Sequence, residues 1–156
     1  MKWYLVQHGE AVAKNVDPNR PLSARGKRDV EHMAGFLKKC GVTPDRILHS
    51  GKTRAHQTAE ILAGALSIEG AAEAVSGLDP DDPVETFFTG THTLKQDTML
   101  VRHLPFLSRV VSYFVTGDPD RAVVAFTPGC IVCLERDAGQ NWRIQWMLRP
   151  DCPGRE

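Results

Sequence analysis

Three short segments of this 156-residue chain combine residue types that could do chemistry, histidine and arginine among them, and each segment begins where a predicted β-strand ends. The segments are Gln7-His8-Gly9, residues 50–54, and Arg102-His103. In open α/β sheets, ligands bind outside the carboxyl ends of the strands. We therefore expect residues that are far apart in the sequence to converge on one crevice.

The residue types in this crevice favour phosphate chemistry. A neutral imidazole is a nucleophile, and covalent catalysis divides one difficult displacement into two easier ones. Phosphoryl transfer needs mainly positioning and positive charge, which arginine supplies through its planar, bidentate donors. An arginine at the positive end of a helix, as expected for Arg54, is unfavourable unless an anion lies there. No H-E-x-x-H or similar spacing occurs, so we expect no metal and no cofactor.

The elements that must position these segments alternate between strand and helix. Strands are expected at residues 2–6, 46–48, 98–101, 122–126, 130–135 and 142–148. Helices are expected from the cap Ser23 to the stop Gly41, over residues 55–66, from Asp82 onward, and over residues 105–114. On the last strand, Trp142 and Trp146 are expected to share one face.

This alternation predicts the α/β class. The expected architecture is a three-layer sandwich, with a mostly parallel central sheet, helices on both faces and an antiparallel C-terminal element. No repeat or linker divides the chain, so residues 1–156 are expected to form a single domain.

Composition excludes several classes of partner. Basic and acidic residues balance at 19 each, which leaves no net field to attract nucleic acid or a membrane surface. No signal-peptide pattern or membrane-length apolar run is present, and the cysteines are few and scattered. We therefore expect a cytoplasmic protein with no nucleic-acid and no membrane partner.

Four segments together resemble the motifs of the histidine phosphatase superfamily. His8-Gly9-Glu10 is similar to its nucleophile motif, usually written Arg-His-Gly, and His103-Leu104-Pro105 is similar to its second histidine motif. Residues 50–59 resemble the signature S-P-x-x-R-A-x-Q-T-A, and residues 20–23 resemble the R-P-L-[ST] segment of the short phosphohistidine phosphatase branch. The resemblance extends from about residue 2 to residue 148 and implies a phosphoglycerate mutase-like fold.

The resemblance also implies roles for individual residues. His8 would be the nucleophile and form a transient phosphohistidine that water then hydrolyses, while Arg54 and Arg20 would hold the phosphoryl oxygens. His103 would donate a hydrogen bond to them. Catalysis is thus assigned to His8, Arg54 and His103. The neighbouring positions expected to bind substrate are Gln7, Gly9, Arg20, Ser50 and Arg102.

A general acid is not singled out by the pattern. The candidates are Glu10 and the acidic residues Asp79, Asp81, Asp82 and Glu85. We interpret Asp82 and Glu85 as helix-capping residues. A phosphohistidine substrate would not need a strong acid, because its P–N bond already has a good leaving group.

Three positions depart from the superfamily pattern. Gln7 stands where the superfamily has arginine; glutamine still donates hydrogen bonds but carries no charge. The loss of one donor at a transition state typically costs about 10²–10³ in rate. Arg102 could supply part of the missing charge, or strand alternation could turn it away. Gly51 replaces a proline, which would only loosen the turn.

The sequence thus leaves three functional hypotheses. The first is a phosphatase acting on phosphohistidine of a protein, or on a small phosphoester, through His8. The second is a phosphate-binding regulatory module with catalysis weakened by Gln7. The third is a phosphatase for a small sugar phosphate or nucleotide phosphate.

Overall fold

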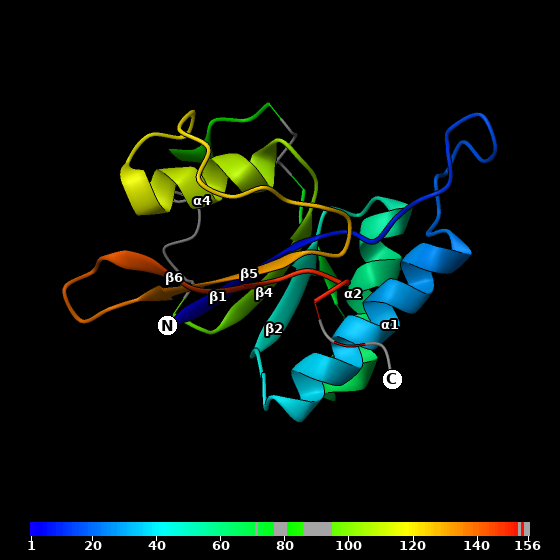
Figure 1. Ribbon diagram of the computed structural model, residues 1–156, viewed down its shortest axis with the longest axis horizontal. Helices are drawn as coiled ribbons and strands as arrows, with labels where there is room; N and C mark the ends of the chain where they lie inside the picture. Colours follow the sequence, from blue (N-terminus) through cyan, green and yellow to red (C-terminus); the bar gives the residue numbers. More distant parts are fainter. Residues whose placement is uncertain (71, 77–80, 86–94, 153, 155–156) are drawn as a thin grey trace.

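The computed structural model describes residues 1–70, 72–76, 81–85, 95–152 and 154, and it places helices on both faces of a central sheet (Figure 1). Its elements, in chain order, are β1 (Lys2–Gln7), α1 (Ala24–Lys39), β2 (Arg46–His49), α2 (Thr53–Leu66), β3 (Glu73–Ala74), β4 (Thr98–Arg102), α4 (Phe106–Thr116), β5 (Ile131–Arg136) and β6 (Trp142–Leu148).

The sheet is mostly parallel, as the sequence predicted. Within the described residues it has six strands in the order β3-β2-β4-β1-β5-β6. β3, β2, β4 and β1 run parallel, whereas β5 pairs antiparallel with β1 and β6 antiparallel with β5. The carboxyl ends of β2, β4 and β1 therefore lie side by side at one edge of the sheet, and the predicted α/β class is confirmed.

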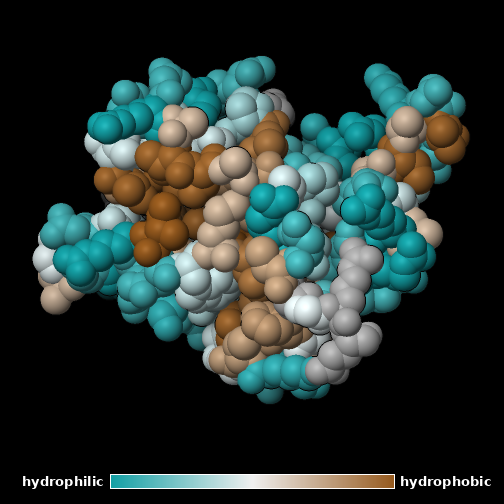
Figure 2. Space-filling view, in the orientation of Figure 1, coloured by the Kyte–Doolittle hydropathy of each residue, from teal (hydrophilic) through white to brown (hydrophobic). Residues whose placement is uncertain are grey.

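Two apolar cores, one on each face, hold the layers together. Alternate residues of β1 divide between them: Tyr4 and Val6 pack with α1 and α2, while Trp3 and Leu5 pack with α4. Figure 2 shows hydrophobic side chains where α4 meets the sheet. The side of the sheet on which a residue near a strand end lies therefore decides which helices it can reach.

Helix α1 begins and packs as its sequence indicates. The Ser23 hydroxyl accepts a hydrogen bond from the Gly26 N–H at 3.0 Å, which satisfies a donor that the first turn leaves unpaired. Apolar residues at helical spacing, from Val30 to Leu37, form its buried face. The chain leaves the helix through Gly41, whose φ of 70° suits glycine.

The predicted strand at residues 122–126 is wrong. Among the described residues, this segment pairs with no strand of the sheet. Its apolar side chains Val124 and Phe126 pack against the core under α4 instead. They stabilise the fold through side-chain burial and not through a hydrogen-bonded ladder.

Trp142 and Trp146 lie on opposite faces of the sheet, contrary to the sequence prediction. The pairing of β5 with β6 shifts between Cys133 and Leu134, which adds one residue to β6 and reverses the alternation. Trp142 consequently contacts Trp3 on the α4 side, with ring centroids 5.7 Å apart, whereas Trp146 lies beside Tyr4 on the other side.

Of the helix predicted from Asp82, Val84 and Glu85 are helical, and the positions after Glu85 lie outside the described residues, as does Asp79. The short strand β3 was not predicted. Among the described helices, none is long and apolar enough to cross a membrane.

Candidate active site

His8 follows the last residue of β1 and is held by the backbone on both sides. Its N–H donates to the carbonyl of Arg102 at 3.2 Å, and its own carbonyl accepts from the N–H of Gly129 at 3.1 Å. The two bonds anchor His8 between the end of β4 and the loop before β5. The position of the imidazole is therefore set by the sheet itself.

The hydrogen bonds of the His8 ring define its tautomer. Nδ1 lies 2.7 Å from the carbonyl oxygen of Gly9, which can only accept, so Nδ1 carries a proton. Nε2 accepts a hydrogen bond from Nε of Arg54 at 3.2 Å and so is unprotonated. Burial, opposed in part by the Gly9 carbonyl and reinforced by Arg54 and Arg20, lowers the pKa of His8 to about 4. The ring is neutral at pH 7, with its Nε2 lone pair directed at the guanidinium.

His103, which follows β4, places a second neutral imidazole next to the first. The two ring centroids are 4.9 Å apart. Burial, and after it the neighbouring His8 and Arg54, lowers the pKa of His103 to about 3. Its Nε2 lies 2.6 Å from the hydroxyl of Ser50, at the end of β2, while its buried Nδ1 has no hydrogen-bond partner among the described residues.

Arg54 lies in the first turn of α2, where the backbone N–H groups point toward an incoming anion. That turn contains no acidic residue, and its N-cap, Lys52, makes no side-chain capping bond. The positive end of the helix dipole is thus uncompensated by protein groups. Thr58 fixes this turn: its hydroxyl donates to the Arg54 carbonyl at 2.7 Å and accepts from the Gly9 N–H at 3.1 Å.

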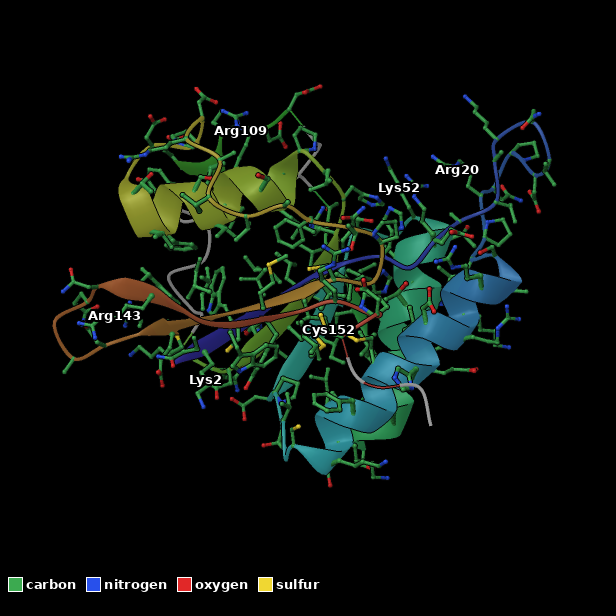
Figure 3. All side chains as sticks on the ribbon, viewed as in Figure 1. Lys2, Arg20, Lys52, Arg109, Arg143 and Cys152 are labelled. Carbon is green, nitrogen blue, oxygen red and sulfur yellow. The ribbon has the colours of Figure 1, made fainter. Side chains whose placement is uncertain are left out.

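Arg20 adds a further cation at the rim of the site. Figure 3 shows Arg20 and Lys52 on the same edge of the molecule, near the start of α2, with Lys2 at the opposite edge. The Nε of Arg20 donates to the carbonyl of Val12 at 3.2 Å. Burial, and then the charge of Arg20, lowers the pKa of Arg54. An anion bound here would relieve the mutual repulsion of the two guanidinium groups.

Gln7 and Arg102 are neighbours in the sheet, but Arg102 turns away from the two histidine rings. The two residues pair across β1 and β4. The Arg102 guanidinium lies 5.8 Å from the centre of the Phe106 ring on α4 and donates to the carbonyl of Val75 at 3.1 Å. Gln7 is buried, and its side-chain oxygen has no partner among the described residues. By strand alternation Gln7 also faces α4, so this geometry favours support of the site from behind over direct contact with substrate.

The backbone around Gly9 requires close approach to α1. A Cβ at Gly9 would come within 2.7 Å of a Val30 methyl group, and a Cβ at Gly26 would clash with the Glu10 carbonyl oxygen. The Glu10 carboxylate accepts a hydrogen bond from the Ser23 hydroxyl at 2.8 Å. Glu10 is therefore engaged at the start of α1, which favours a structural role over that of general acid.

The structure thus brings together His8, Arg54, His103 and Ser50, with Gly9 behind them and Arg20 at the rim. Sequence reasoning missed Thr58, which joins Gly9 to Arg54, and it gave no role to His49 and His56, whose ring centroids lie 4.9 Å apart. No group of three or more histidine, cysteine or acidic side chains within the described part of the chain could hold a metal ion.

Comparison with known proteins shows which proteins this chain resembles. A sequence profile of the histidine phosphatase superfamily (branch 1) matches residues 3–77, which include the segments that carry His8, Arg20, Ser50 and Arg54. This match over nearly half of the chain, the fold and the relatives described next together align the chain with the histidine phosphatase superfamily.

One relative matches almost throughout. The phosphohistidine phosphatase SixA of Escherichia coli (strain K12) is 26% identical over 155 residues, which span 96% of this chain and 94% of SixA. The solved structure of the protein histidine phosphatase SixA complexed with tungstate superposes with a TM-score of 0.80 at 26% identity, over 96% of this chain and 97% of that one.

The fold alone does not define the substrate. A phosphoserine phosphatase from Entamoeba histolytica, solved in complex with 3-phosphoglyceric acid, has a TM-score of 0.72 at only 12% identity, over 94% of this chain and 95% of that one. At that identity the likeness concerns the architecture and not the substrate.

Proposed function

We propose that this protein hydrolyses phosphohistidine on a phosphorylated protein, or a small phosphoester, through a covalent phosphohistidine on His8. The observation that carries the proposal is the neutral His8 ring, whose Nε2 lone pair is directed at Arg54 at the positive end of α2. A nucleophile that is unprotonated and faces cationic donors is what attack on a phosphoryl group requires.

The reaction would proceed in two displacements. Nε2 of His8 forms a bond to phosphorus while the bond to the leaving nitrogen or oxygen breaks, and the leaving group takes up a proton. Arg54 moves from its bond with Nε2 to the phosphoryl oxygens, which Arg20 and His103 also approach. Water then attacks phosphorus, and orthophosphate and free His8 result.

The choice of a phosphohistidine substrate rests on two supports. The similarity to SixA, a phosphohistidine phosphatase by name, spans nearly the whole chain. The hydrogen bond between Ser23 and Glu10 favours a structural role for Glu10, the candidate general acid nearest to His8 in the sequence. A P–N bond has the leaving group that depends least on such an acid. A phosphorylated histidine of another protein is accordingly the proposed partner.

The alternative favoured by a specific observation is a phosphate-binding module with weakened catalysis. Gln7 contributes no charge, its side chain is buried, and Arg102 is engaged with Val75 and Phe106. Neither Gln7 itself nor Arg102, its neighbour in the sheet, thus replaces the charge that the superfamily arginine would bring.

Turnover of phosphohistidine and of p-nitrophenyl phosphate by wild type, His8→Ala and Gln7→Arg separates these functions. We expect turnover in wild type that His8→Ala abolishes, whereas His32→Ala, a control on α1, should retain it. An inert wild type with an active Gln7→Arg variant would favour the binding module. Equal rates in wild type and His8→Ala would refute the nucleophile assignment.

A further inference from the structure

Behind the site, two histidines and a glutamate form a hydrogen-bonded series that ends at the surface of α2. The N–H of Gly51 donates to Nδ1 of His49 at 3.0 Å. Nε2 of His49 lies 3.3 Å from Nδ1 of His56, and Nε2 of His56 lies 3.2 Å from the carboxylate of Glu60. His49 is only 3% exposed, whereas the side chains of His56 and Glu60 are 45% and 62% exposed.

The backbone donor at Gly51 fixes the proton positions along this series. Because Nδ1 of His49 accepts from an N–H, the proton of its neutral ring must be on Nε2, which then donates to His56. His56 accepts on Nδ1 and therefore carries its own proton on Nε2, facing the carboxylate of Glu60. An added proton on either ring would set two donors against each other and break a bond of the series.

The series ends one residue from a group of the active site. Ser50 lies between His49 and Gly51, and its hydroxyl meets Nε2 of His103 at 2.6 Å. Gly51 has a φ of +83°, and its N–H is the donor that His49 accepts. The proline of the superfamily signature could provide neither that φ nor an N–H. The glycine and His49 therefore depend on each other, and the substitution does more than loosen the turn.

We propose that His49 is a positioning residue that fixes the Ser50 turn and thereby the His103 ring, and that His56 and Glu60 connect this turn to the exposed face of α2. His56 from α2 and the backbone carbonyl of Ala72 before β3 lie beside the His49 ring, and the charges of Glu60 on α2 and of Arg102 on β4 also act on it. Burial is the main cause that lowers the pKa of His49, followed by His56, which agrees with a ring held neutral.

Two substitutions of His49 separate its acceptor from its volume. His49→Leu keeps a side chain of roughly similar volume but removes the acceptor for the Gly51 N–H. His49→Asn restores an acceptor, because an asparagine side chain can bond the N–H two residues later. His56→Ala leaves the bond from Gly51 in place and removes only the acceptor for His49 Nε2, so its effect should be the smaller.

The test combines kinetics with the ring ¹⁵N signals of His103, measured with and without tungstate. His49→Leu should lower kcat by about three- to tenfold, the size that one net hydrogen bond supports, with little change in KM. It should also move the His103 signals, and His49→Asn should recover most of both effects. Unchanged His103 signals in a folded His49→Leu protein would overturn the proposal, and so would a His49→Asn protein as impaired as His49→Leu.

The kinetic consequence rests on the proposed function, but the positioning does not. If wild type turns over no substrate, the proposed function fails, and the His103 signals still decide whether His49 positions that ring. If His49→Leu does not fold, His56→Ala serves instead: a His103 signal that stays fixed while the His49 signal moves would refute the coupling.

Discussion

The neutral ring of His8 should make the stability of this protein depend on pH in a way that a His8→Asn variant does not share. Burial, together with Arg54 and Arg20, lowers the pKa of His8 from 6.5 to about 4. At a pH above the ordinary pKa of 6.5, the ring is neutral in both the folded and the unfolded chain and adds no pH dependence. At a pH below 6.5, the unfolded chain takes up a proton that the folded protein excludes, so unfolding becomes more favourable until the pH reaches the folded-state pKa of about 4.

The size of this effect follows from the two pKa values. Between about pH 7.5 and about pH 4.5, linkage predicts that His8 removes about 2.5 kcal/mol from the free energy of unfolding. Urea unfolding of wild type and His8→Asn at both pH values measures it as a difference of differences, in which proton uptake by His103, present in both proteins, largely cancels. An NMR titration of the His8 ring gives the midpoint directly.

Two results would refute this reasoning. One is an equal loss of stability in wild type and in His8→Asn on acidification. The other is a His8 ring that titrates near the ordinary histidine value of about 6.5. Either would mean that the fold does not hold the ring neutral, and the nucleophile would then be partly protonated under mildly acidic conditions.

Two substitutions test other parts of the site. Arg54→Gln should weaken tungstate binding and lower kcat/KM by about 10²–10³. Arg54→Lys should lie between Arg54→Gln and wild type, because lysine keeps the charge without the bidentate geometry. Calorimetry measures the tungstate affinity and steady-state kinetics the rate, and a wild-type affinity in Arg54→Gln would contradict this prediction. Gly26→Ala should lower the free energy of unfolding by about 2 kcal/mol or more, because the new Cβ would clash with the Glu10 carbonyl. Gly35→Ala in the same helix meets nothing within 4 Å and should raise the free energy of unfolding by about 0.5–1 kcal/mol. Equal shifts of the two variants in thermal unfolding would contradict the packing argument.

The layers of the fold could be read from the sequence because they depend on short-range patterns. Ser23 with the apolar spacing of α1 predicted that helix, and the apolar runs before His8, Ser50 and His103 predicted three strands. Since parallel neighbours end at the same edge of a sheet, the meeting of His8, Arg54 and His103 followed from strand ends alone.

The direction of individual side chains required the tertiary structure. The shift in pairing beside Cys133 sends Trp142 and Trp146 to opposite faces, and nothing in the sequence of β6 marks that shift. Arg102 turns toward Phe106, and no periodicity could show whether its guanidinium or only its carbonyl would serve the site.

For His8, too, the sequence indicates the residue, whereas the tertiary structure determines its protonation. Its neighbours in sequence, and its place after a strand, were enough to single it out as the candidate nucleophile. Which nitrogen holds the proton depends on the Gly9 carbonyl and on Arg54, and the guanidinium reaches the ring only when α2 packs against the sheet. The sequence alone thus determined the residue and its neighbourhood, whereas only the packed structure decided its tautomer and lowered its pKa, because both depend on burial and on charges from distant parts of the chain.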